Sequence, residues 1–343
     1  MPHLLILHQG ALGDFLLALS IIQSVRAALS PDRVTAIASA PSARLAAGRS
    51  AVDAYLSPEA VALHALFTDT ASDHRLSAIL AGATTILNFL SAPADPIHTR
   101  LSRLTSARII SIDPRPTEAT IASRLHITNQ WAAAIRAQNL PLPDPAPTRI
   151  HLRNPANPRN LRSELETTEL RSSSAKSILI HPGSGGQHKC WPLERFIALA
   201  EALRPAKIHW LLGPAEHLSV PHQAEPVFAP PYQGGVGGGA ASPRFAALQA
   251  HCLAHAQPVH IEHDLESAAQ HMIAADLYIG NDSGATHLAA ALAIPTLAIF
   301  GPTDPTIWRP LGENVHVVAP PTPSAITSVP LAAVLSAATI LIR

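Results

Sequence analysis

The first part of the chain alternates short apolar runs with a longer stretch of helical periodicity. Residues 4–7 form a continuous apolar run, which is typical of a strand buried on both faces. Apolar residues then recur at helical spacing over 15–29, and a second apolar run follows at 34–38. This order predicts a strand–helix–strand unit and therefore a parallel sheet, which 86–90 and 108–112 extend.

The same pattern starts again in the second half of the chain. Residues 177–180 form a buried strand followed by a glycine-rich turn, and further apolar runs predict strands at 208–212, 277–279 and 296–300. An apolar stretch at 331–343 predicts a terminal helix that packs on a domain.

Two segments have a different composition. A proline-rich and then charged stretch over 141–176 predicts a linker, with a short helix around 163–170. Residues 220–243 are rich in proline and glycine and predict a mobile surface insertion. We therefore expect four parts: an N-terminal α/β domain at 1–150, a linker at 151–176, a C-terminal α/β domain at 177–325 and a terminal helix at 326–343.

Charge and composition narrow the class of protein. The 343 residues contain 24 Lys+Arg and 24 Asp+Glu, so the chain lacks the basic excess of a nucleic-acid-binding protein. The lone cysteines Cys190 and Cys252 favour a reduced compartment over a disulfide framework. The N-terminus lacks a signal-peptide pattern, and no continuous apolar run reaches about 18 residues. We expect a cytoplasmic protein, at most in peripheral contact with the inner face of a membrane.

A first group of candidate functional residues lies between the first strand and the first helix. Gly10 and Gly13 let the backbone approach a ligand, and Asp14 follows them at the start of the helix. The spacing differs from the dinucleotide-binding fingerprint. Asp14 either projects into a ligand cleft or caps the helix and offsets its dipole.

A second group follows the first strand of the second domain, over residues 181–192. A glycine-rich loop with Ser184 and Lys189 resembles a phosphate cradle. Cys190 stands where a Walker A loop has Ser or Thr, and no hydrolase elbow surrounds Ser184. The alternative is a polar surface turn.

A third group follows the strand at 277–279. Asn281, Asp282 and Ser283 are residue types that begin helices, and an alanine-rich helix comes next. The free N–H groups at such a helix start bind diphosphates well. His287 either faces the cleft or makes a core contact.

Because parallel sheets bind ligands at the carboxyl ends of their strands, we expect all three groups to meet in one cleft. Two phosphate-binding candidates in the second domain would then face one carboxylate from the first. This arrangement favours a nucleotide diphosphate held by the C-terminal domain and a base supplied by the N-terminal one.

The three groups resemble glycosyltransferase family 9, which includes the lipopolysaccharide heptosyltransferases. The matching residues are Leu12-Gly13-Asp14 with 16–19, His181-Pro182-Gly183-Ser184 with Lys189 and Trp191-Pro192, and Gly280-Asn281-Asp282-Ser283-Gly284 with 287–290, 300–305 and Trp308. The resemblance implies the GT-B architecture, in which two Rossmann-like, doubly wound parallel-sheet α/β domains face a central cleft. It also implies an inverting, metal-independent transfer of a sugar, typically heptose from ADP-heptose, to a glycan or lipid-linked glycan acceptor.

The resemblance assigns roles to individual residues. Asp14 would be the general base, Asp282 would hold sugar hydroxyls, and Glu216 would hold the ribose. The side chains of Ser184 and Lys189 would hold the diphosphate. The backbone N–H groups of Ser283, Gly284 and Ala285 would also donate to it. His287 would lie near the donor sugar or its phosphates. No cofactor is implied.

The chain departs from the family pattern at two positions of the first domain. His8 stands where an arginine is common, and Ser20 stands where the family usually has proline. The alternatives are a nucleotide-sugar epimerase or hydrolase of the same shape, and a non-catalytic nucleotide-sugar-binding protein. The histidine-rich segments at 252–255 and 260–263 lack the spacing of a known zinc site, so we expect no metal.

Overall fold

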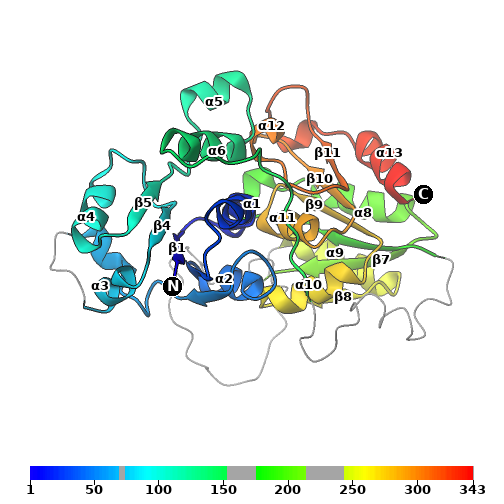
Figure 1. The fold of residues 1–343 in the computed structure, drawn as a ribbon. Coiled ribbons are helices and arrows are strands. Elements are labelled where there is room, and N and C mark those ends of the chain that lie inside the picture. The colour runs from blue at the N-terminus through cyan, green and yellow to red at the C-terminus, as the bar shows by residue number, and fades with distance from the viewer. Residues whose placement is uncertain (69–73, 153–174, 214–242, 343) are drawn as a thin grey trace.

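Two parallel β-sheets, each covered by helices on both faces, make up the protein (Figure 1). A computed structural model describes residues 1–68, 74–152, 175–213 and 243–342. Glu216, the expected helix at 163–170 and most of the expected linker and insertion lie outside these ranges.

The N-terminal sheet has the strand order β3-β2-β1-β4-β5, with all pairs parallel. Its strands are β1 (His3–Leu7), β2 (Arg33–Ile37), β3 (Ala54–Leu56), β4 (Thr85–Asn88) and β5 (Arg108–Ser111). Its helices are α1 (Leu12–Leu29), α2 (Ala40–Ala46), α3 (His74–Ala81), α4 (Pro96–Leu104), α5 (Glu118–Ser123) and α6 (Ile127–Ala137), with a 3-10 turn η1 at Leu63–Phe67.

The C-terminal sheet repeats this plan, with the order β11-β10-β9-β6-β7-β8 and parallel pairs throughout. Its strands are β6 (Ser177–His181), β7 (Lys207–Leu212), β8 (Val259–Ile261), β9 (Leu277–Asn281), β10 (Thr296–Ile299) and β11 (Val315–Val318). Its helices are α8 (Leu193–Ala202), α9 (Pro243–Ala254), α10 (Leu265–Ile273), α11 (Gly284–Ala291), α12 (Pro305–Trp308) and α13 (Leu331–Ile342), with 3-10 turns η3 at Gln187–Lys189 and η5 at Ile326–Ser328.

The continuous apolar runs became strands because both faces of each sheet are buried. In β1, Leu4 and Ile6 contribute to the core beneath α1 and α6, whereas Leu5 and Leu7 contribute to the core beneath α3 and α4. The predicted strands are confirmed, and so is the terminal helix α13, which packs against α8. The short edge strands β3, β8 and β11 escaped prediction because they are only partly buried and lack long apolar runs.

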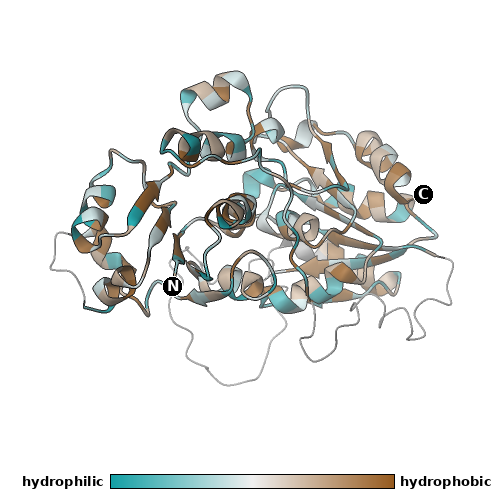
Figure 2. Cartoon of the chain, viewed as in Figure 1, coloured by the Kyte–Doolittle hydropathy of each residue, from teal (hydrophilic) through white to brown (hydrophobic). Residues whose placement is uncertain are grey.

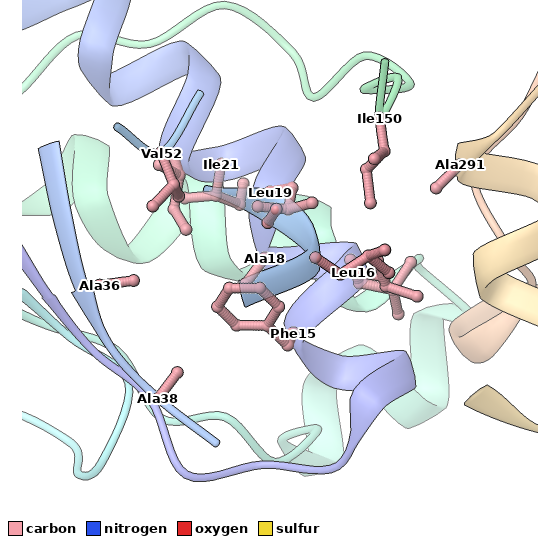
Figure 3. Packing of buried hydrophobic residues seen from close by; sticks show 14 of the residues in the cluster. Phe15, Leu16, Ala18, Leu19, Ile21, Ala36, Ala38, Val52, Ile150 and Ala291 are labelled. Carbon is pink, nitrogen blue, oxygen red and sulfur yellow. The ribbon is translucent and has the colours of Figure 1, made fainter. Parts of the chain in front are cut away.

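Helix α1 is the centre of the largest core and joins the two domains. Ten of its 18 residues are buried, and its core cluster continues into Leu288 and Ala289 of α11. Figure 3 shows Phe15 and Leu16 of this core, with Ile150 and Ala291 close by. Figure 2 shows how strongly apolar α1 and the strands are.

The apolar composition of α1 also raises the question of membrane insertion. Among the described helices, α1 is long and apolar enough to cross a membrane by length and composition. The helix is not a continuous apolar run, because Asp14, Gln23 and Arg26 interrupt it. In the structure, burial between two protein layers accounts for the apolar surface of α1.

Polar contacts add to this apolar interface. The backbone N–H of Ile150 donates to the carbonyl of Ala291 at 2.8 Å. Arg124 pairs with Asp304 at 3.4 Å, and Arg49 pairs with Glu266. The position of one domain on the other is therefore set by a shared core and by contacts around its rim.

Candidate active site

The three groups of candidate residues all lie where the strand order of a sheet reverses. In the N-terminal sheet this point lies between β1 and β4, and in the C-terminal sheet it lies between β6 and β9. Loops at such points form the ligand crevice of open parallel sheets. Asp14 follows β1, the loop at 182–192 (the central loop) follows β6, and Asp282 follows β9.

Asn281 joins the second and third groups into one unit. Its side chain is fully buried, and its Oδ1 accepts a hydrogen bond from the backbone N–H of Trp191 at 3.0 Å. Its Nδ2 donates to the carbonyls of Pro182 at 2.9 Å and Gly183 at 3.2 Å. Asn281 therefore holds both ends of the central loop. From the sequence, Asn281 was expected to begin a helix and to belong to the family-9-like motif, but this bridging role was not predicted.

The central loop brings its two polar side chains onto residue 282. The Ser184 hydroxyl donates to the main-chain carbonyl of Asp282 at 2.8 Å. The Lys189 Nζ lies 2.8 Å from Asp282 Oδ2 in a charge-assisted hydrogen bond. The side chain of Asp282 is 8% exposed and that of Lys189 is 31% exposed, so solvent or a ligand reaches the lysine more easily.

Helix α11 begins beside this pair. The Ser283 hydroxyl accepts from the backbone N–H of Thr286 at 3.4 Å and so caps the helix. Gly284 and Ala285 occupy the first helical positions, whose N–H groups have no partner within a helix. Both residues are partly exposed. Their N–H groups and the positive end of the helix dipole can therefore bind an anion.

Asp14 lies at the start of α1, whose N-terminal end packs against that of α11, next to the Lys189–Asp282 pair. Its Oδ2 accepts the backbone N–H of Ala11 at 3.2 Å, so it does cap the helix. Burial raises the pKa of the Asp14 carboxyl, and the negative charge of Asp282 raises it further. The Ala11 hydrogen bond and the positive charge of Lys189 lower this pKa. The charges of Lys189 and Asp282 thus act on Asp14 across the domain boundary. The net direction is upward, which makes the carboxylate more basic than usual.

Two glycines let the N-terminal ends of α1 and α11 approach each other. A Cβ on Gly284 would lie 2.9 Å from the Leu12 Cβ, and a Cβ on Gly13 would lie 3.2 Å from the His287 Cδ2. His287 therefore packs between the two helix starts and is 7% exposed. Burial lowers the pKa of His287 to about 4, so its imidazole is neutral at pH 7.

His8 is also neutral, although the resembling family often has an arginine at this position. Its ring is 2% exposed and packs edge-on against Phe15 and Phe89 at centroid distances of 5.3 and 5.6 Å. Burial lowers the pKa of His8 to about 4, and Nδ1 accepts the Gly10 N–H at 3.2 Å. The first domain therefore offers a fixed loop here but no positive charge.

Comparisons with known proteins agree with these motifs. The sequence profile described as "Glycosyltransferase family 9 (heptosyltransferase)" matches residues 240–329. Over 165 residues the chain is 28% identical to Lipopolysaccharide heptosyltransferase 3 of Escherichia coli. That alignment covers 47% of this chain and 41% of the relative, which is less than half of the relative's length.

Two solved structures share the fold over nearly the whole chain. A glycosyl transferase family 9 protein from Veillonella parvula matches with a TM-score of 0.68 at 15% identity, covering 99% of this chain and 97% of that one. The ADP-heptose lps heptosyltransferase II of E. coli matches with a TM-score of 0.67 at 17% identity, covering 100% and 98%. The resemblance to family 9 and the GT-B architecture are thus confirmed.

Proposed function

We propose that the chain is a glycosyltransferase that moves a sugar from a nucleotide diphosphate to an acceptor hydroxyl. One observation carries the proposal: the start of α1, which bears Asp14, packs against the start of α11 beside the Lys189–Asp282 pair. In the proposed enzyme Asp14 would supply a base from one domain, and Lys189 would supply a phosphate-binding cation from the other. The similarity to named heptosyltransferases supports the same reading.

We propose ADP-heptose as the donor. The second structural neighbour is an ADP-heptose lps heptosyltransferase, and the E. coli relative is a lipopolysaccharide heptosyltransferase. In this chain Ser184, Lys189 and the first N–H groups of α11 would hold the diphosphate. Asp282 would hold sugar hydroxyls, and Glu216, outside the described residues, would hold the ribose.

The chemistry follows from this placement. Breaking the bond between the anomeric carbon and the diphosphate oxygen leaves negative charge on the diphosphate. Lys189 and the positive end of α11 stabilise that charge, so the proposed transfer needs no metal. The acceptor hydroxyl attacks from the opposite face, which inverts the anomeric centre, and Asp14 takes its proton.

The acceptor is proposed on the same grounds. A lipopolysaccharide-type glycan matches the name of the curated relative. A lipid-linked acceptor would bring the protein into peripheral contact with the cytoplasmic face of a membrane.

The experiment is Asp14→Asn, with Asp95→Asn as the matched control. Both aspartates accept a backbone N–H at the start of a helix, from Ala11 and from Ile97, and asparagine accepts it equally well. We expect Asp14→Asn to slow transfer by about 10²- to 10⁴-fold, because it removes the proton acceptor. Its melting temperature should not fall, because the raised pKa means that the ionised carboxylate costs stability at neutral pH.

Each protein is assayed for donor dissociation constant, melting temperature and turnover with ADP-heptose and a heptose-bearing acceptor. Near-normal turnover in Asp14→Asn would reject the base and leave Asp14 as a helix cap. Donor turnover without acceptor would favour an epimerase or hydrolase. Donor binding without any turnover would favour a non-catalytic binding protein.

A further inference from the structure

Three metal-ligating side chains meet on helices α8 and α9, away from the proposed active site. Glu201 is near the end of α8, His251 is in the last turn of α9, and His255 directly follows α9. One candidate ligand atom of each lies within 4.8 Å of the others. Glu201 is eight positions after the start of α8, about 12 Å along the helix from the central loop.

The distances suit an ion better than direct hydrogen bonds. Glu201 Oε1 lies 3.7 Å from His251 Nδ1 and 3.9 Å from His255 Nε2, which exceeds hydrogen-bonding distance. Two ligands of a tetrahedral zinc ion, each bonded at about 2.0–2.1 Å, lie roughly 3.4 Å apart. Small rotations of the partly exposed Glu201 and His255 side chains would close this difference.

The protein environment also prepares the histidines as ligands. His251 and His255 are four positions apart and project from one side of the helix end. The His251 side chain is 7% exposed, and its Nδ1 is the ring nitrogen that lies 3.7 Å from Glu201 Oε1.

We propose that Glu201, His251 and His255 bind a divalent transition metal, with Zn²⁺ as the natural occupant. Two imidazoles and one carboxylate form a ligand set that suits Zn²⁺ rather than Mg²⁺ or Ca²⁺. Water would complete the coordination on the exposed side of Glu201. The ion would fasten the end of α9 to α8, so its role is structural.

The expectation of no metal rested on the spacing within 252–255 and within 260–263. The site combines His251 and His255 with a third ligand, Glu201, from another helix. The competing explanation is a simple ion pair in which a protonated histidine faces Glu201.

The test uses the full chain with any affinity tag removed and bound metal stripped by chelation. Zn²⁺ is titrated at pH 7.5 by calorimetry, and Co²⁺ is added as a probe whose visible absorption reports coordination by nitrogen and oxygen. We expect one Zn²⁺ per chain and a higher melting temperature with metal. Glu201→Gln and His255→Ala should each weaken binding at least ~10-fold, the lower range for loss of a supporting group around a metal.

His316→Ala, an exposed histidine on β11, is the control and should bind Zn²⁺ as the parent does. His271→Ala tests a separate stack formed by His260 and His271, whose ring centroids lie 3.8 Å apart. Absence of Zn²⁺ binding to the parent would overturn the proposal. Binding that survives in Glu201→Gln and His255→Ala, or that is lost only in His271→Ala, would also overturn it. The result does not depend on any transferase activity.

Discussion

Asp282 has two roles in the proposed mechanism, one toward Lys189 and one toward the donor sugar, and the substitution Asp282→Asn distinguishes them. Its carboxylate neutralises Lys189 at 2.8 Å, and it is also proposed to hold sugar hydroxyls. Asp282→Asn keeps the shape of the side chain and removes the charge. The Ser184 hydroxyl bonds to the main-chain carbonyl of residue 282, so this contact survives the change.

The two roles predict opposite effects on two ligands. ADP has no sugar, so it experiences Asp282 only as a repelling charge next to its diphosphate. At about 6 Å and an effective dielectric constant of about 20, that repulsion is roughly 3 kcal/mol. Because the Lys189 side chain is 31% exposed, solvent screening reduces the effect to about 1 kcal/mol, or ~5-fold tighter ADP binding.

ADP-heptose should respond in the other direction. Hydrogen bonds to a charged group contribute about 1.5–3 kcal/mol, so losing those to the sugar weakens binding by ~10- to 150-fold before the gain is subtracted. Lys189→Ala is the reference variant, and it should weaken both ligands, because it removes the cation and leaves a nearly buried carboxylate beside the diphosphate.

The assay is calorimetric titration of ADP and ADP-heptose into the parent, Asp282→Asn, Lys189→Ala and the double variant. The melting temperature of each protein checks that the fold is intact. If Asp282→Asn weakens ADP as strongly as ADP-heptose, then Asp282 serves to orient Lys189 and does not hold the sugar. Equal affinities in all four proteins would refute the assignment of this pair to donor binding.

Two further predictions concern stability. Gly284→Ala should lower the free energy of unfolding by about 1–3 kcal/mol, because the added Cβ would lie 2.9 Å from the Leu12 Cβ between α1 and α11. Urea unfolding measures this loss. The control Gly185→Ala should show none, because its Cβ would meet nothing within 4 Å. Burial lowers the pKa values of His8 and His287 to about 4, below the ordinary 6.5, so protonation favours unfolding. Their contribution is complete above pH 6.5 and is lost as pH falls toward about 4, with a slope approaching about 1.4 kcal/mol per pH unit for each histidine. Urea unfolding at pH 7.5 and 5.0 measures this loss, and an unchanged unfolding free energy at pH 5.0 would contradict it.

Sequence alone determined the features that depend on neighbouring residues. The apolar runs at β1 and β6 predict buried parallel strands, because both faces of these strands must be covered. The order of strand, glycine-rich turn and helix places Asp14, Lys189 and Asp282 at the same edge of their sheets. The Ser283 cap is equally local, since it needs only the N–H groups of the next turn.

Only the tertiary structure decided which of these residues meet. The buried amide of Asn281 holds the central loop through partners about a hundred positions away, and no local pattern reveals such bonds. The approach of α1 to α11 turns His287 into a buried neutral group, and the packing of α8 against α9 brings Glu201 to His251. Each of these contacts depends on how two distant elements pack, because hydrophobic burial fixes the elements in space and the polar side chains follow.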